Sequence, residues 1–272
     1  MPLRNPYKND GRRWQTEAME FRRSRAVVPV LEYLEEAGST NDVLVARASG
    51  LPDLSVIVTG HQTGGRGRLG RSWVSPAGKS LAISILLKPV GLPLERYSWF
   101  PLLAGLAMSR ALATVVPAGV EVKWPNDVLI DGAKVSGTLA ELLPDLSGVV
   151  IGAGLNLTLS RDELPTETST SLLLAGAPAD LDPDAVLAGY LTAFTLLYRE
   201  FLTAGGDPVG SALRDEVVEA CHTVGRAVRV ELPSGETLLG EATGIDEDGR
   251  LIVRSDAGIT AVAAGDVTHL RY

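Results

Sequence analysis

The segment whose residues could most clearly do chemistry is 64–73, Gly-Gly-Arg-Gly-Arg-Leu-Gly-Arg-Ser-Trp. Its glycines can adopt backbone conformations that are closed to other residues, and its arginines carry a planar cation that suits carboxylate and phosphate oxygens. We expect a flexible cationic loop that wraps a small anionic ligand, with Trp73 stacking on a flat group. A solvated basic turn would have the same composition, so the rest of the chain has to decide.

A second polar group is the segment Lys123-Trp124-Pro125-Asn126-Asp127. Proline offers no N–H to a β-ladder, so the segment belongs at the edge or the end of a strand. Asp131-Gly132 is a tight-turn signal. In a hairpin around this turn, Lys134 lies close to the end of the strand that carries Asp127. An ordinary strand exit and a solvated lysine remain alternatives for these residues taken alone.

Other segments resemble motifs that bind phosphate or supply a nucleophile, but each lacks a required residue or has the wrong neighbouring element. Gly78-Lys79-Ser80 resembles the end of a P-loop, but Trp73 stands where the first glycine is required and a strand follows instead of a helix. Gly152-Ala153-Gly154 resembles a dinucleotide fingerprint that lacks its third glycine. No Gly-x-Ser-x-Gly elbow is present, and Cys221 is expected to be a buried, inert thiol.

Composition restricts the partners and the compartment of this 272-residue chain. Its net charge of −8 argues against a general nucleic-acid binder, because a phosphate backbone requires a cationic surface. A single cysteine excludes an intrachain disulfide and favours the reducing cytoplasm. His61, His222 and His269 have no zinc-ligand spacing with Cys221, so we expect no structural metal. A secretory signal and a run of 18 apolar residues are both missing, so we expect no membrane partner.

Hydrophobic periodicity predicts the elements that position these residues. We expect strands over 27–34, 54–59, 80–87, 120–130, 133–142 and 148–157. We expect helices after the capping signal at 39–42 and over 95–116, 182–202 and 211–222. Short strands over 228–232, 237–244, 251–254 and 259–263 alternate with turns, which is typical of a small barrel or sandwich. The predicted parts are an N-terminal extension (1–26, or a peripheral helix over 14–25), a large domain (27–222) and a small β domain (223–272).

The order of the motifs carries more information than any one of them. Ser39-Thr40-Asn41 is followed by Gln62 with the glycine-arginine loop, then by Lys-Trp-Pro-Asn-Asp, by Lys-x-x-Gly-x-Leu from Lys134, and by Gly-x-Gly-x-Asn-Leu from Gly152. Over residues 27–272 this order resembles the biotin protein ligase family, in the short form without an N-terminal DNA-binding domain. The resemblance implies an α+β fold. A mixed β-sheet with packed helices, like that of class II aminoacyl-tRNA synthetases, would form the catalytic domain, and residues 223–272 would form an SH3-like barrel.

The resemblance also implies an activity. Members of the family use ATP and Mg²⁺ to activate biotin as biotinyl-5′-AMP, and they transfer it to one lysine of a biotin carboxyl carrier domain of an acyl-CoA carboxylase. The chain would be a cytoplasmic monomer or homodimer. A lipoate–protein ligase and a non-catalytic biotin-sensing protein remain alternatives. Lipoate has no ureido group, so the polar residues Ser39, Thr40 and Gln62 would then lack a purpose.

The resemblance assigns residues to each part of the site. The biotin site would comprise Ser39, Thr40, Asn41, Gln62, Gly65, Arg66, Gly67, Arg68 and Lys134. The nucleotide site would comprise Arg66, Arg71, Trp73, Lys123, Asn126 and Asn156, with Asp127 as a candidate Mg²⁺ ligand. Lys134 and Arg68 would be catalytic. The residue types agree, because a neutral ureido ring needs neutral donors and acceptors, whereas two anions that must react need cations around them.

Overall fold

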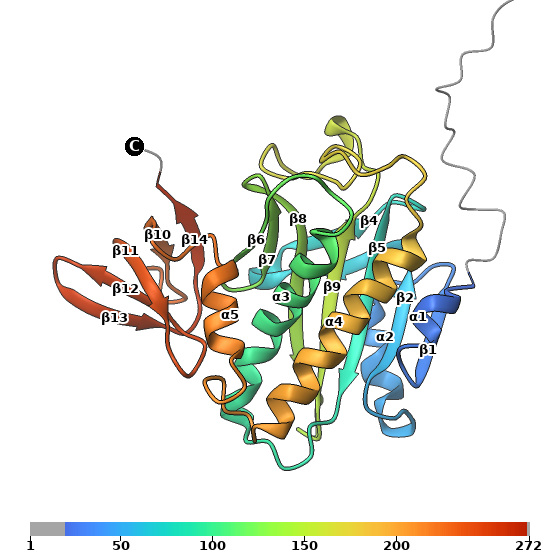
Figure 1. The fold of residues 1–272 in the computed structure, drawn as a ribbon, viewed down its shortest axis with the longest axis horizontal. Helices are drawn as coiled ribbons and strands as arrows, with labels where there is room; N and C mark the ends of the chain where they lie inside the picture. Colours follow the sequence, from blue (N-terminus) through green and yellow to red (C-terminus); the bar gives the residue numbers. More distant parts are fainter. Residues whose placement is uncertain (1–19, 271–272) are drawn as a thin grey trace, which may run out of the picture.

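The computed structural model describes residues 20–270, which form a large α+β domain and a smaller C-terminal β-sheet (Figure 1). Most of the predicted extension, 1–26, lies outside the described residues, and so does most of the alternative helix over 14–25. The described end of this segment forms the short helix α1 (Arg22–Arg25). Phe21, just before it, is buried in the main core.

The large domain is built on a mixed seven-stranded sheet in the order β1-β2-β5-β9-β8-β7-β6. β1 and β2 run parallel, and every other neighbouring pair is antiparallel. A mixed sheet was predicted, and the structure contains one. Its strands are β1 (Val30–Leu34), β2 (Ser55–Thr59), β5 (Ser80–Leu87), β6 (Val120–Lys123), β7 (Asp127–Ile130), β8 (Ala133–Leu142) and β9 (Val149–Asn156).

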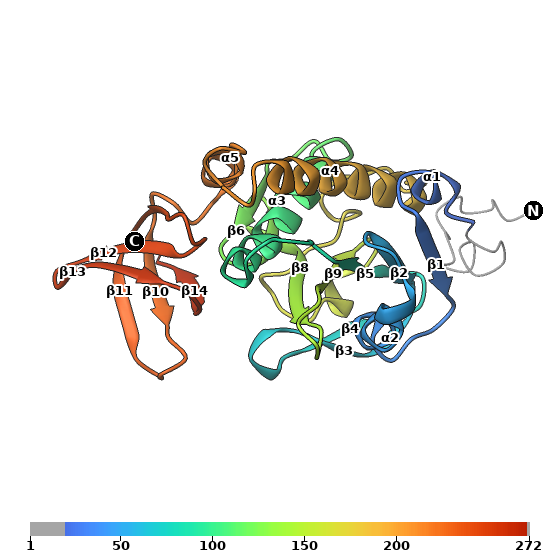
Figure 2. The same ribbon diagram turned by 90° about the horizontal axis from the view of Figure 1, so that it is seen from below.

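Helices cover both faces of this sheet, with α3 and α4 on one face and α2 on the other (Figure 2). Every residue of β5 is buried, as a central strand covered on both sides should be. A small apolar core under α2 contains Leu44, Ile57 and Leu86. The main core lies between the sheet, α3 and α4. The helices are α2 (Thr40–Arg47), α3 (Phe100–Leu112), α4 (Pro183–Thr203) and α5 (Leu213–Ala220).

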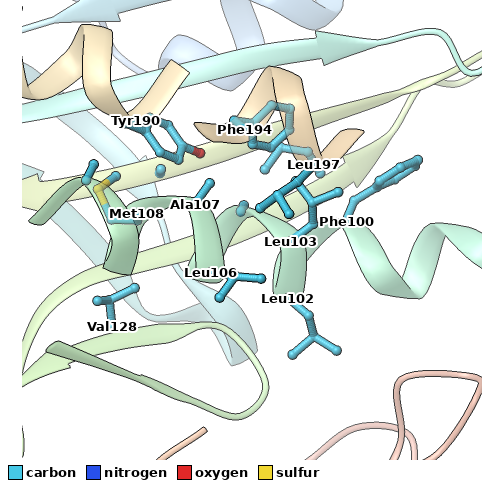
Figure 3. Packing of buried hydrophobic residues seen from close by; sticks show 14 of the residues in the cluster. Phe100, Leu102, Leu103, Leu106, Ala107, Met108, Val128, Tyr190, Phe194 and Leu197 are labelled. Carbon is cyan, nitrogen blue, oxygen red and sulfur yellow. The ribbon is translucent and has the colours of Figure 1, made fainter. Parts of the chain in front are cut away.

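Within the described part of the chain, α4 is the one helix that is long and apolar enough by composition to cross a membrane. Here its apolar side packs on α3, where Tyr190, Phe194 and Leu197 are buried (Figure 3). An apolar stripe that is covered by a neighbouring helix is the pattern of a core helix.

Two predicted elements are each divided into two in the structure, and a proline lies at each division. The helix predicted over 95–116 is a 3₁₀ segment (Leu94–Trp99) followed by α3. Pro101 stands in the first turn of α3, where its missing N–H leaves no hydrogen bond unmade. The strand predicted over 120–130 is divided into β6 and β7 at Pro125, because proline cannot donate to the ladder.

The glycine-arginine segment is a hairpin rather than an irregular loop. β3 (Gln62–Arg66) and β4 (Ser72–Ser75) pair antiparallel, and a 3₁₀ turn (Arg68–Gly70) joins them. Glycine and arginine give no strand signal of their own, so the sequence pattern missed both strands. The backbone pairing places the arginines at defined points along one edge of the cleft described below.

The C-terminal part is an antiparallel sheet in the order β13-β12-β11-β10-β14. The sequence predicted four of these strands and missed β14, which is short and half polar. The described pairings leave the sheet open, so its closure into an SH3-like barrel stays a prediction. The strands are β10 (Ala227–Glu231), β11 (Thr237–Ile245), β12 (Leu251–Ser255), β13 (Gly258–Val262) and β14 (Asp266–His269).

Two buried tryptophans of the large domain donate hydrogen bonds to this sheet. The indole Nε1 of Trp99 donates to the carbonyl oxygen of Glu247 at 2.9 Å, and that of Trp124 donates to the carbonyl oxygen of Gly249 at 3.0 Å. Both rings are almost wholly buried. The turn between β11 and β12 is therefore bound to the same segment that carries Lys123.

Candidate functional site

A cleft of about 800 Å³ lies where the start of α2, the β3–β4 hairpin, β8, β9 and β14 meet. All but one of the predicted site residues line it, although they come from segments far apart in the sequence. They are Ser39, Thr40, Asn41, Gln62, Arg66, Gly67, Arg68, Arg71, Trp73, Lys123, Asn126, Asp127, Lys134 and Asn156.

Gly65 is the exception, because it is buried and does not line the cleft. A Cβ atom at this position would lie 2.0 Å from Nε2 of Gln62 and 2.3 Å from the carbonyl oxygen of Trp73. Its position therefore does not support the predicted contact with biotin. The missing side chain instead makes room for Gln62 to turn toward α2.

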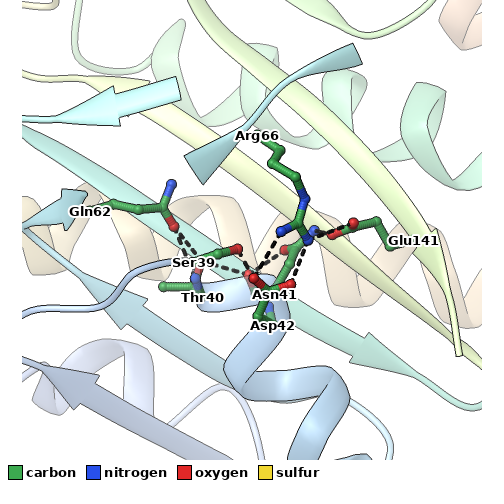
Figure 4. Close-up of polar contacts among 8 residues, drawn as sticks. Ser39, Thr40, Asn41, Asp42, Gln62, Arg66 and Glu141 are labelled. Atoms are coloured by element: carbon green, nitrogen blue, oxygen red, sulfur yellow. Dashed lines mark hydrogen bonds and ion pairs between the residues drawn. The ribbon is translucent and has the colours of Figure 1, made fainter. Parts of the chain in front are cut away.

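One end of the cleft is a network of neutral hydrogen-bonding groups at the start of α2 (Figure 4). Ser39 caps the helix and accepts from the backbone N–H of Asp42 at 3.4 Å, as its place before the first turn predicted. Oε1 of Gln62 accepts from the backbone N–H of Thr40 at 2.9 Å and from its hydroxyl at 3.2 Å. Ser84 of β5, which the sequence did not indicate, bonds to both Thr40 and Asn41.

Arg66 lies over this end and is held by two carboxylates (Figure 4). Its guanidinium makes a two-pronged contact with Asp42, at 2.8 and 2.5 Å, and a third bond with Glu141 of β8 at 2.9 Å. These bonds lower the pKa of Asp42 and raise that of Arg66. The sequence did not single out Glu141. The period of two along β8 could have done so, because Gly137, Leu139 and Glu141 share the face that lines the cleft.

The other end of the cleft contains an aromatic ring and several cations. The Trp73 ring lies directly against β9, since a Cβ atom on Gly154 would stand 2.1 Å from it. Lys134 Nζ is 5.8 Å from the centre of that ring and 2.7 Å from Oδ1 of Asp127. The hairpin predicted around Asp131-Gly132 is present. It places Lys134 beside Asp127, as the sequence predicted.

Two of the cations at this end have no carboxylate partner among residues 20–270. Burial lowers the pKa of Lys123 and also that of Arg68. Arg68 donates only to Oδ1 of Asn126 at 3.2 Å and to the carbonyl oxygen of Gly265 at 3.4 Å. A half-buried cation without a counterion is costly, so these two groups favour an anionic ligand.

The two asparagines predicted for the nucleotide site have structural bonds of their own. Nδ2 of Asn126 donates to the carbonyl oxygen of Thr138 at 2.7 Å, and Nδ2 of Asn156 donates to the carbonyl oxygen of Thr170 at 2.9 Å. Asn126 therefore fixes the turn before β7, and Asn156 fixes the loop after β9. Both still border the cleft.

The C-terminal sheet supplies a wall of the cleft that the sequence gave no reason to expect. Arg71 forms an ion pair with Asp266, and His269 lines the cleft near His222, with 5.0 Å between the ring centres. Burial, together with the nearby charge of Lys123, lowers the pKa of His269 to about 4. The Arg71–Asp266 pair joins segments 195 residues apart, and His222 and His269 also come from separate elements, so no local pattern could have revealed these contacts.

The residues present offer little for a tightly held divalent metal. Within the described residues, no group of three His, Cys, Asp or Glu side chains could hold a metal ion. The candidate Asp127 supplies one carboxylate, and this group is paired with Lys134. A Mg²⁺ ion bound mainly through substrate phosphates and water would still fit such a site.

Comparison with known proteins gives a consistent result. Residues 34–156 match the model of the biotin/lipoate A/B protein ligase family, and residues 223–270 match the biotin protein ligase C-terminal domain. The chain is 36% identical over 246 residues to a biotin--[acetyl-CoA-carboxylase] ligase of Mycobacterium tuberculosis, and the match covers 89% of each protein.

Solved structures agree in fold. A biotin protein ligase from Aquifex aeolicus in complex with biotin and ATP is 28% identical, has a TM-score of 0.74, and covers 89% of this chain and 99% of its own. A biotin protein ligase from Leishmania major in complex with biotinyl-5-AMP is 26% identical, has a TM-score of 0.57, and covers 90% of this chain and 99% of its own.

Proposed function

Because the chain belongs to the biotin protein ligase family, we propose that it is an ATP-dependent ligase that forms biotinyl-5′-AMP in this cleft. It then transfers the biotinyl group to a specific lysine of a biotin carboxyl carrier domain of an acyl-CoA carboxylase. The observation that carries this proposal is that one cleft has neutral hydrogen-bonding groups at the start of α2 and, at its other end, two cations that have no carboxylate partner within residues 20–270.

The first step joins two anions. An oxygen of the biotin carboxylate attacks the α-phosphorus of ATP, the bond to the β-phosphate oxygen breaks, and pyrophosphate leaves. Lys134 is the group we assign between the carboxylate and the α-phosphate, and Arg68 closes over the same point. Their charges offset the repulsion and stabilise the charge that develops on the phosphoryl oxygens. When ATP arrives, its phosphates would compete with the Asp127 carboxylate for the ammonium group of Lys134.

The second step transfers the acyl group. The neutral ε-amine of the carrier lysine attacks the acyl carbon, the bond to the AMP oxygen breaks, AMP leaves, and the new ammonium loses a proton to water. The mixed anhydride must survive until the carrier arrives. The hairpin that carries Arg66 and Arg68 would serve as the lid that retains it.

The remaining assignments follow from charge and shape. Ser39, Thr40, Asn41 and Gln62 would hold the ureido end of biotin, while Trp73 would border the adenine. Lys123 and Arg71 would face the phosphates. Mg²⁺ would come with ATP and contact the protein through Asp127 at most. We also propose a cytoplasmic enzyme that works as a monomer or a homodimer.

The test is transfer to a carrier domain. The purified protein, ATP, Mg²⁺ and biotin are mixed with a biotin carboxyl carrier domain, and the intact mass of the carrier is measured. We expect the mass of one biotinyl group on one lysine, and a carrier with that lysine changed to arginine is the control. Parallel reactions with lipoate test the lipoate-ligase alternative, and adenylate from lipoate alone would reverse the assignment. Biotin binding without any adenylate would favour the sensing alternative.

A further inference from the structure

Glu141 occupies a junction between the floor of the cleft and the hairpin above it. Its Oε2 accepts from Nδ2 of Asn41 at 2.5 Å, and its Oε1 accepts from the guanidinium of Arg66 at 2.9 Å (Figure 4). Both carboxylate oxygens are therefore used, one toward the biotin end of the floor and one toward the lid.

The floor residue that Glu141 contacts is itself fixed. Oδ1 of Asn41 accepts from the Ser84 hydroxyl at 2.5 Å. A Cβ atom on Gly152 would lie 2.5 Å from the same oxygen, so the bare backbone of β9 makes the space that Asn41 fills. Asn41 is 5% exposed. Glu141 thus rests on a packed and hydrogen-bonded support.

The hairpin is held at its base by backbone and at its far end by side chains. The backbone N–H of Thr63 donates to the carbonyl oxygen of Ala37 at 3.0 Å, and that of Gly64 donates to the carbonyl oxygen of Gly38 at 2.7 Å. Beyond this base, Arg66 joins the hairpin to α2 and β8, while Arg68 and Arg71 join its tip to Asn126, Gly265 and Asp266.

We propose that Glu141 is a positioning residue, which holds the lid closed over the biotin end of the cleft through Arg66. The proposal rests on the proposed function in taking this end as the biotin site. Glu141 does not itself need to touch biotin. Together with the other contacts of the hairpin, it lengthens the time for which the hairpin stays closed, and so it slows the escape of biotin and biotinyl-5′-AMP.

Glu141 is better placed for this role than Asp42, the other partner of Arg66. The side chain of Glu141 is 27% exposed and that of Asp42 is 57% exposed. Water screens an exposed pair more strongly, and Asp42 has no bond to the floor residue Asn41. The bond from Arg66 to Glu141 therefore couples the lid to the cleft floor, whereas the two-pronged bond to Asp42 ties the lid to the more exposed first turn of α2.

The arrangement also divides the work of the two neighbouring arginines. Arg66 is compensated by two carboxylates, so its charge is largely satisfied before any ligand binds. Arg68 has no carboxylate partner among the described residues and remains available to an anionic substrate. Arg66 therefore holds the lid closed, and Arg68 contacts the reacting groups.

The experiment uses the full chain and the variant Glu141→Gln, which keeps the shape and the acceptor for Asn41 but removes the charge. The control is Glu32→Gln, because Glu32 forms a similar half-exposed ion pair with Arg47 on α2 at 2.7 Å, away from the cleft. The first readout is the rate of trypsin cleavage after the arginines of the hairpin, without ligands. The second is the rate of biotin dissociation in stopped flow.

We expect Glu141→Gln to speed both cleavage and biotin dissociation by about threefold to tenfold, the range that a partly exposed charged hydrogen bond supports. The conservative variant Glu141→Asp should fall between Glu141→Gln and the native chain. The control should match the native chain in both readouts. Equal cleavage and dissociation rates in the native chain and Glu141→Gln would overturn the proposal. A native chain that fails to bind biotin would overturn the proposed function instead, and the cleavage rates would still decide the role of Glu141.

Discussion

The two ends of the cleft differ in how far their polar and charged groups already have partners within the protein. At the end near α2, the polar side chains of Thr40, Asn41 and Gln62 already have protein partners. At the other end, Lys123 and Arg68 have no carboxylate partner within residues 20–270. A site for a neutral ring can be completed in advance, because its donors and acceptors can bond to one another at little cost. A site that must neutralise anions has to leave cations unsatisfied until those anions arrive.

At each end of the cleft, a glycine of β9 leaves room for a side chain of the site. Gly152 and Gly154 are two residues apart and so face the same side of the sheet. Gly152 makes room for Asn41 at one end, and Gly154 makes room for the Trp73 ring at the other. The pair offers a matched way to test whether the two ends act separately.

The strongest test of the contrast is Lys134→Ala, which removes the central cation. We expect adenylate formation to fall by about 10²- to 10³-fold, because a preorganised charge is lost where charge develops. Biotin affinity should change little, because the neutral end is untouched. Pyrophosphate release measures the first effect and calorimetric titration the second. Normal adenylation with an unchanged melting temperature would remove Lys134 from the mechanism.

Arg68→Gly tests the lid at the charged end. We expect biotinyl-5′-AMP to leave before transfer, so that lysines of unrelated proteins become labelled in proportion to their exposure. Labelling of bystander protein such as serum albumin should rise at least about tenfold, the effect of losing roughly 1.4 kcal/mol of retention. Streptavidin blotting of the mixture measures it. Strict carrier labelling by this variant would contradict a role for Arg68 in retention.

Gly154→Ala and Gly152→Ala sharpen the comparison, because each adds one methyl group to the same strand. Overpacking of this kind costs about 1–3 kcal/mol. Gly154→Ala should raise the KM for ATP by displacing Trp73, with biotin affinity preserved. Gly152→Ala should weaken biotin by displacing Asn41, with the KM for ATP preserved. If each variant weakened both ligands equally, the two ends would not be separable.

The smallest expected effect concerns His269 at the C-terminal wall. Its pKa of about 4 lies below the ordinary value of about 6.5, so the folded protein binds fewer protons than the unfolded chain between these values. The free energy of unfolding should therefore fall as the pH drops from about 6.5 to 4. After allowance for solvent screening, His269→Gln should remove about 1 kcal/mol of this decline. Urea unfolding at pH 7.5 and pH 5 measures it, and an unchanged decline would contradict the assignment.

Much of the fold could be predicted because its signals are local. β5 and β8 begin and end where the pattern of apolar residues predicted them, and Ser39 begins α2 as its capping signal indicated. The errors arose where one residue outweighs a periodic pattern. Pro125 divides a strand that periodicity alone would have continued, and Pro101 lies in the first turn of α3, where the preceding 3₁₀ segment gives way to the α-helix.

The sequence predicted which residues line the site better than it predicted which of them bond to one another. Motif order brought together Gln62, Lys134 and Asn156, which do line one cleft. It could not show that Arg66 is paired with Glu141, or that Arg71 reaches Asp266. Such pairs depend on how separate elements pack. A single charged residue on a strand looks the same in the sequence whether its side chain faces solvent or an oppositely charged partner.

The indole bonds from Trp99 and Trp124 to the carbonyl oxygens of Glu247 and Gly249 have a consequence for dissection of the chain. Removal of the C-terminal module would take away the acceptors of both indole N–H groups and expose two large rings to water, and it would remove the Asp266 carboxylate whose charge acts on Lys123. The C-terminal sheet therefore supports the site beside it. A sheet taken from a relative would have to present carbonyl oxygens at the same two positions.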